Sequence, residues 1–135
     1  MADHVLSVRS IDANYGRARI LHGVSLEVGA GEAVALMGRN GAGKSTTLKT
    51  ITGLVSPVSG EIVFHDTPIG GLPAYRIARM GLGYVPEERR IFTDLSVYEN
   101  LEVGKPPPRN GPDPWTPERL VELVPNLAQL RGPRA

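Results

Sequence analysis

Residues 38–46 read Gly38-Arg39-Asn40-Gly41-Ala42-Gly43-Lys44-Ser45-Thr46, and this stretch decides the fold class. Its first eight residues fit the spacing G-x-x-x-x-G-K-[ST]. Before it, the apolar run Ala33 to Met37 predicts a strand buried on both faces. After it, Lys44 to Leu54 predicts a helix that ends near Gly53. The residues expected on one side of that helix are Leu48, Ile51 and Val55.

The loop has the chemistry that a polyphosphate requires. Its glycines let the backbone curl so that consecutive N–H groups point inward. The helix beginning near Lys44 adds the positive end of its dipole, and Lys44 adds a full charge for the β- and γ-phosphates. The Ser45 hydroxyl is placed to hold Mg²⁺, which prefers oxygen ligands, and Thr46 adds a second hydroxyl. The alternative, a glycine-rich turn that binds nothing, fits the strand and helix context poorly.

Composition excludes several other classes of protein. The net charge of +1 gives no basic surface of the kind that nucleic-acid binding needs. The absence of cysteine excludes a disulfide framework and a thiol nucleophile. No apolar run approaches the roughly 20 residues that cross a bilayer, and the first ten residues lack the layout of a signal peptide. We therefore expect a cytoplasmic chain whose membrane association comes only through a partner.

Further elements are predicted along the chain. Val24, Leu26 and Val28 alternate with Ser25 and Glu27, which indicates a half-buried strand. Residues 61–65 predict a short strand after a loop at 56–60, and residues 82–85 a buried strand. Helices are predicted at 73–80, at 96–103 behind a Ser96–Glu99 capping box, and after Thr116-Pro117. Residues 105–114 read as a proline-rich loop, and 131–135 as a frayed end.

Three features resemble the ATPase subunits of ABC transporters. They are the string GRNGAGKSTTLKTITGL at 38–54, the tyrosine Tyr15 within IDANYGRARILHGVSLEVGAGE at 11–32, and the turn Ser59-Gly60-Glu61-Ile62. The resemblance implies an α/β P-loop NTPase fold, with an antiparallel β subdomain beside the P-loop strand and helix. It also implies that Tyr15 stacks on adenine. The alternative for Tyr15 is a half-buried strand tyrosine.

Residues 81–101, GLGYVPEERRIFTDLSVYENL, resemble the Q-loop region of this family. More narrowly, they resemble the LivF-type subunits that serve branched-chain amino acid uptake, which carry glutamate where most relatives have glutamine. The resemblance implies that Glu87 contacts Mg²⁺ and the attacking water, and that its loop touches the membrane subunit. Glu88 is better explained as part of a solvated turn. Arg89 and Arg90 could equally pair with a partner or face water.

The resemblance covers nearly the whole chain but only the N-terminal half of the family's ATPase domain. The family's LSGGQ signature, Walker B Asp-Glu and switch histidine do not occur in these residues. Residues 62–66 end an apolar run in Asp66, but too soon after the helix, so a turn is predicted there. His4, His22 and His65 do not cluster in sequence and suggest no metal site. We expect one partial domain over 1–135 with an incomplete core, marginal stability and little or no ATP hydrolysis.

The function that the resemblance implies is ATP binding with Mg²⁺ in an ABC importer of branched-chain or related amino acids. Its partners would be transmembrane permease subunits and a second ATPase subunit, on the inner face of the cell membrane. Lys44 and Glu87 would be catalytic, with Ser45 and Glu87 at the metal. The alternatives are a non-catalytic nucleotide-binding module and a soluble ABC ATPase not tied to transport. A P-loop kinase or GTPase is disfavoured, because no N-K-x-D motif occurs and because Tyr15 lies upstream.

Overall fold

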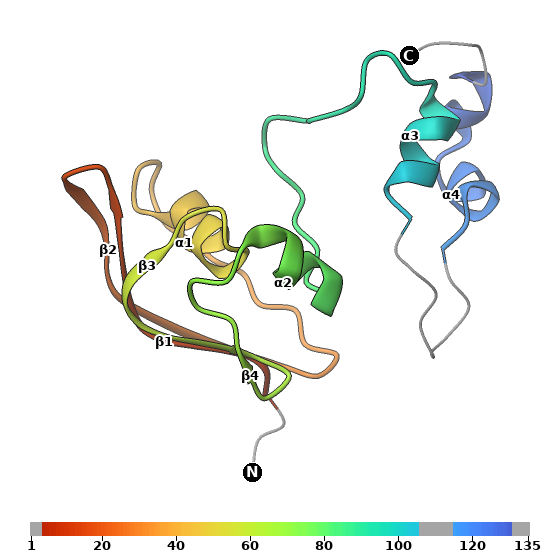
Figure 1. Cartoon of the computed structure of the whole chain (residues 1–135). Coiled ribbons are helices and arrows are strands. Elements are labelled where there is room, and N and C mark those ends of the chain that lie inside the picture. The colour runs from red at the N-terminus through yellow and green to blue at the C-terminus, as the bar shows by residue number, and fades with distance from the viewer. Residues whose placement is uncertain (1–3, 106–114, 131–135) are drawn as a thin grey trace. The chain divides into compact units, whose positions relative to one another are not determined.

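A computed structural model describes residues 4–105 and 115–130 of the 135. The predicted proline-rich loop at 105–114, apart from Lys105, and the predicted frayed end at 131–135 lie outside these residues. The chain divides into two compact units, residues 1–85 and residues 86–135. The positions of the units relative to one another are not determined, so each is described by itself (Figure 1).

The first unit is built on a four-stranded antiparallel sheet in the order β2-β1-β3-β4. The strands are β1 (His4–Tyr15), β2 (Ala18–Gly29), β3 (Pro57–Phe64) and β4 (Thr67–Pro68). The predicted alternation in β2 is confirmed, because Val24, Leu26 and Val28 are partly buried while Ser25 and Glu27 are exposed. The loop predicted at 56–60 is wrong from Pro57 onward, since this segment pairs with β1 and extends β3.

Two tight turns join neighbouring strands. Gly16 follows β1 with φ of +57°, a value that glycine adopts without strain and that hairpin turns commonly require. His65 and Asp66 join β3 to β4 with φ of +44° and +59°. Asp66 therefore lies in a turn, as the sequence predicts, and is not the carboxylate at the end of a central strand.

Two helices belong to the first unit, α1 (Lys44–Ile51) and α2 (Ala74–Met80), and α1 contacts β1 and β2 (Figure 1). α1 ends three residues before the predicted boundary. Its end forms a Schellman motif: Gly53, with φ of +79°, donates to Thr50 O, and Leu54 donates to Lys49 O at 2.9 Å.

Of the three residues predicted on one side of this helix, Ile51 is buried and Val55 packs against the core, but Leu48 does not. Leu48 is 46% exposed, whereas the buried residues are Thr46, Thr47, Thr50 and Ile51. The loop before the helix fixes this rotation, because Gly43 packs directly on Leu21 of β2. The apolar core of the unit consists of Leu6, Val8, Ile11, Ala13, Leu21, Ile51, Ile62, Phe64, Ile69 and Ile77.

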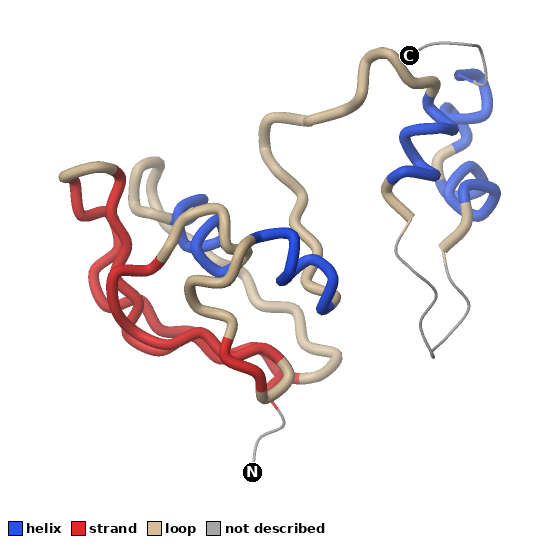
Figure 2. Tube along the Cα trace, viewed as in Figure 1, coloured by secondary structure: helices blue, strands red, loops and turns tan. Residues whose placement is uncertain are grey.

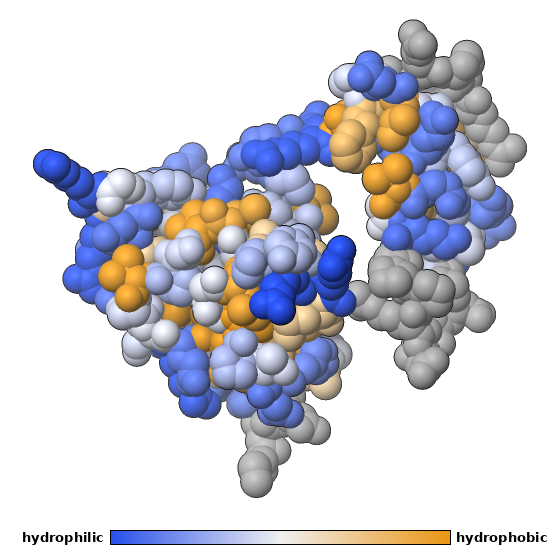
Figure 3. Space-filling model, viewed as in Figure 1, coloured by the Kyte–Doolittle hydropathy of each residue, from blue (hydrophilic) through white to orange (hydrophobic). Residues whose placement is uncertain are grey.

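Two predicted buried strands are absent as strands from the described residues. Ala33 to Met37 and Leu82 to Val85 both have irregular backbone, drawn as loop in Figure 2. Met37 is 88% exposed and Val85 is 93% exposed. These predictions are wrong because a strand requires a neighbour to take its backbone hydrogen bonds, and the sheet is built from β1 to β4 alone. Figure 3 shows apolar atoms on the visible surface of this unit.

The second unit contains α3 (Val97–Val103), α4 (Pro117–Leu123) and the 3₁₀ helix η1 (Pro125–Leu130). The predicted capping box is confirmed: Ser96 Oγ accepts from the Glu99 amide, and the Glu99 carboxylate accepts from the Ser96 amide at 2.7 Å. The predicted cap at Thr116 is also present, since its hydroxyl accepts from the Arg119 amide. The Asn100 side chain accepts a hydrogen bond from the Phe92 amide and donates one to Phe92 O. These two bonds connect α3 to the segment before it.

Candidate functional site

The loop between Gly38 and Ser45 is curled rather than extended. The Ala42 amide donates to Arg39 O at 3.1 Å, which closes a turn inside the loop. Gly41 and Gly43 have φ of +83° and +95°, a region in which side-chain-bearing residues are strained. The glycine spacing that defines the motif is therefore required by the backbone path.

Lys44 folds back over the start of the loop. Its Nζ donates to Gly38 O and to Arg39 O, the second contact being 2.8 Å long. The aliphatic part of the side chain passes 3.9 Å from the position that a Cβ on Gly38 would take. An ammonium group, the curled amides and the N-terminus of α1 are thus brought together, and no acidic residue lies in the first turn of α1.

The hydroxyl residues that follow Lys44 have different environments. Ser45 is exposed, so its hydroxyl is accessible to a ligand, whereas Thr46 is 8% exposed. Thr47 Oγ1 donates to Gly43 O at 2.8 Å, and Thr50 Oγ1 donates to Thr46 O at 2.7 Å. Ser45 is therefore the hydroxyl in this turn that suits a metal-bound phosphate.

The end of the loop rests on the β1–β2 hairpin. A Cβ on Gly43 would lie 2.8 Å from Leu21 Cδ2 and 3.6 Å from Ile20 O, so only glycine permits this contact. Tyr15, the last residue of β1, is 48% exposed and pairs with Ala18, three residues before Leu21. The hairpin that carries Tyr15 is thus the element against which the phosphate loop packs (Figure 1).

Glu87 is exposed in a turn that follows Pro86. It belongs to the second unit, whereas Lys44 and Ser45 belong to the first. Arg89, with φ of +47°, and Arg90 are also exposed. Within residues 4–105 and 115–130, no three His, Cys, Asp or Glu side chains gather as metal ligands would.

Asp12 is not among the residues predicted from the sequence, although its side chain bonds to both strands that neighbour β1. Its Oδ1 accepts from Arg19 Nη2 at 2.6 Å and from the Gly23 amide at 2.8 Å, and its Oδ2 accepts from Ser59 Oγ at 2.7 Å. The hydrogen bond from Arg19, followed by those from Ser59 and Gly23, lowers the pKa of Asp12 to about 2. An aspartate inside a strand, where this residue type is depleted, is the sequence signal that could have identified it.

The curled glycine loop and the helix that follows it match the phosphate-loop motif of P-loop NTPases. The chain belongs to the ABC transporter family, whose family model matches residues 21–132. No helix in the described part of the chain is both long and apolar enough to span a bilayer.

Two curated relatives illustrate the range of the match. The high-affinity branched-chain amino acid transport ATP-binding protein BraG of Pseudomonas aeruginosa is 39% identical, over 97% of this chain and 56% of that protein. The lipopolysaccharide export system ATP-binding protein LptB of Escherichia coli K12 is 44% identical, over 71% of this chain and 40% of that protein. The chain thus spans about half the length of these relatives.

A solved structure of a bacterial Atm1-family ABC exporter with ATP bound also matches. Its TM-score is 0.67 at 30% identity, over 78% of this chain and 18% of that one. The fold of the described residues is therefore that of part of an ABC ATPase domain.

Proposed function

We propose that this chain binds ATP and Mg²⁺ through residues 38–46, as the N-terminal part of the ATPase domain of an ABC importer for branched-chain or related amino acids. The observation that carries the proposal is the position of Lys44, whose ammonium lies over a curled glycine loop at the N-terminus of α1. An anion at this point would meet a full positive charge, the amides that begin α1 and a helix dipole.

Each predicted site residue has a part in this proposal. The phosphates lie against the backbone of the loop residues, and Lys44 neutralises the β- and γ-phosphates. These loop residues are Gly38, Arg39, Asn40, Gly41, Ala42 and Gly43, and Thr46 adds a hydroxyl. The Ser45 hydroxyl holds Mg²⁺. Glu87 is proposed as a second oxygen ligand near the metal and the attacking water. Tyr15 stacks on adenine, which its exposed position on the hairpin beside the loop allows.

Hydrolysis by the isolated chain should be very slow. Phosphoryl transfer depends on charges arranged all round the γ-phosphate. The 135 residues contain a phosphate loop but neither the LSGGQ signature nor a Walker B Asp-Glu pair. We therefore propose that binding, rather than turnover, is the activity of this chain by itself. The proposed partners are permease subunits and a second ATPase subunit at the inner face of the membrane.

Amino acid import is favoured by the extent of the BraG match, which covers 97% of this chain. The match to LptB covers less of this chain, 71%, but has the higher identity, 44%. It favours a second candidate function, that of the ATPase of an exporter. The glutamate at position 87 supports the importer because the LivF-type subunits carry glutamate there. The two candidates share ATP binding and differ in the permease that the chain would serve.

Calorimetric titration of the whole chain with Mg²⁺–ATP tests the common step. Lys44→Ala should weaken binding about tenfold or more, the effect of losing charge-assisted hydrogen bonds. Lys49→Ala is the matched control, because it removes the same charge from the last turn of the same helix. It should leave the affinity unchanged. Equal affinities for wild type and Lys44→Ala, or no binding by the wild type, would refute the proposed site.

A further inference from the structure

We propose that Asp12 is a positioning residue for the adenine site: by joining β1, β2 and β3 through its side chain, it sets the direction of the hairpin that carries Tyr15. This inference rests on the proposed function, since it concerns the same nucleotide. It adds a specificity-determining role for a residue that lies three positions before Tyr15 and outside the phosphate loop.

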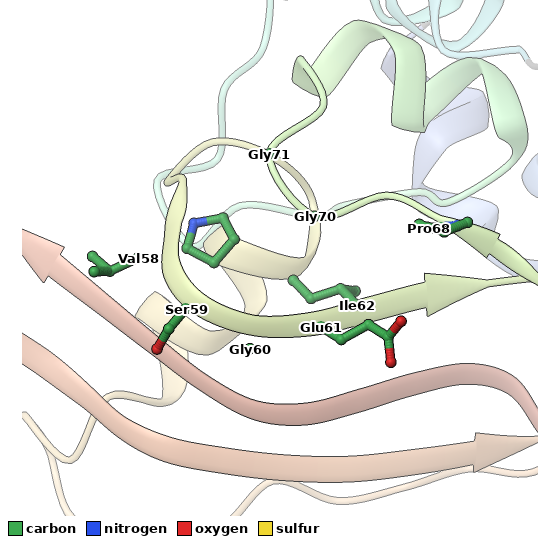
Figure 4. A pocket seen from close by; sticks show the side chains of 9 residues that line it. Val58, Ser59, Gly60, Glu61, Ile62, Pro68, Gly70 and Gly71 are labelled. Atoms are coloured by element: carbon green, nitrogen blue, oxygen red, sulfur yellow. The ribbon is translucent and has the colours of Figure 1, made fainter.

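The side chain of Asp12 is built into the sheet. We name the residues that bond to it, together with Asp12 itself, the Asp12 cluster: Asp12, Arg19, Gly23 and Ser59. Arg19 and Gly23 belong to β2 and Ser59 to β3, so both carboxylate oxygens are used and both neighbouring strands are held. Figure 4 shows the Ser59 side chain directed toward the adjacent strand. The Asp12 side chain is only 20% exposed.

The cluster lies where the backbone ladder is irregular. The pairing of β1 with β2 shifts register between Ile11 and Ala13, and its pairing with β3 shifts on both sides of Asp12. Gly60 comes so close to β1 that a Cβ there would lie 2.5 Å from Ser10 O. Backbone hydrogen bonds are interrupted at such bulges, and the local twist of the strands increases. The carboxylate replaces interrupted backbone bonds and so fixes the twist at this point.

The cluster is connected to both halves of the nucleotide site. Its two β2 members, Arg19 and Gly23, flank Leu21, on which Gly43 of the phosphate loop packs. On the neighbouring strand, the same hairpin ends at Tyr15, paired with Ala18. Loss of the cluster should therefore change the distance between the tyrosine ring and the phosphate loop, while the contacts within the loop stay intact.

The test compares the affinities of the whole chain for Mg²⁺–ATP and for Mg²⁺–tripolyphosphate, which lacks adenine. Asp12→Asn keeps the side-chain volume but replaces one acceptor oxygen with a donor. Asp12→Ala removes the bonding groups altogether. Arg9→Ala is the control, since Arg9 also joins β1 to β3, through a 3.6 Å ion pair with Glu61 between largely exposed side chains. Amide hydrogen exchange at Gly23 reports the cluster directly, without nucleotide.

Both Asp12 variants should lose about tenfold in ATP affinity, within the range of a lost base–aromatic stack, and keep their tripolyphosphate affinity. Arg9→Ala should change neither. In a Tyr15→Ala background, Asp12→Asn should have no further effect on ATP, because Asp12 acts through Tyr15. Gly23 should exchange faster in the Asp12 variants.

Equal losses for ATP and tripolyphosphate, or additive losses with Tyr15→Ala, would overturn the positioning role. Unchanged amide exchange at Gly23 in the Asp12 variants would also overturn the positioning role, whether or not the wild type binds nucleotide. Failure of the wild type to bind nucleotide would by itself refute only the proposed function.

Discussion

At the residue scale, the motif chemistry and the geometry agree most closely at Lys44. A lysine followed by serine at the start of a helix predicts a cation directed at the loop, and Lys44 Nζ does contact Gly38 O and Arg39 O. Gly41 and Gly43 were predictable for the same reason, because the motif demands a tight curl and both have positive φ. Asp12 was not predictable, since its partners lie 7, 11 and 47 positions away.

The role of Tyr15 can be measured separately from that of the phosphate loop. Tyr15→Ala should weaken Mg²⁺–ATP binding by about 1–3 kcal/mol, the range of base–aromatic stacking, and spare inorganic tripolyphosphate. Tyr15→Phe keeps the ring and should bind ATP like the wild type. Calorimetry measures the affinity of each variant for both ligands. An equal loss of affinity for ATP and for tripolyphosphate would mean that Tyr15 supports the sheet and does not stack on adenine.

At the element scale, local signals predicted the starts of two helices, α3 and α4. The capping box at Ser96 and Glu99 and the cap at Thr116 both appear in the structure, because each depends on residues within one turn. The prediction that Leu48 lies on the same side of α1 as Ile51 was wrong, because the packing of Gly43 on Leu21 fixes the rotation of the helix. Contacts between distant segments are not encoded in the period of one helix.

Gly53 provides a prediction for the end of α1. Its φ is +79°, and an added Cβ would lie 2.6 Å from Leu72 O. Gly71 has the same φ, but no atom lies within 4 Å of a Cβ added there. Gly71→Ala is therefore the control for backbone strain alone and should destabilise the chain by about 1–2 kcal/mol. Gly53→Ala should destabilise the chain by about a further 1–3 kcal/mol through the clash. Urea unfolding of both variants measures this difference, and equal midpoints would contradict the close packing.

At the scale of the whole molecule, two apolar segments leave large side chains exposed. Val34, Met37 and Val85 are 48%, 88% and 93% exposed, although each lies in a run that reads as a buried strand. Burial of such side chains is the main favourable term in folding, so leaving them in water removes stabilisation. Exposed apolar surface of this kind also promotes association with other apolar surfaces.

The chain should therefore be marginally stable in isolation. We expect a broad thermal transition with a midpoint below about 60 °C, in the lower part of the usual range of mesophile domains or beneath it. Circular dichroism during heating gives the midpoint, and the fluorescence of a dye that binds apolar surface reports the exposed segments at room temperature. A sharp, reversible transition above about 60 °C, with no dye binding, would contradict this prediction.

The sequence by itself determined whatever depends on neighbouring residues: the phosphate loop, the alternation in β2, the capping box and the turn at Asp66. The tertiary structure alone decided that residues 33–37 and 82–85 did not become strands, that Leu48 of α1 was left exposed, and that Asp12 joins three strands. The physical reason is that a strand or a buried face exists only with a partner, and the partner is a segment elsewhere in the chain. Ala33 to Met37 carries a strand pattern, yet without a neighbour to accept its hydrogen bonds it remains exposed loop.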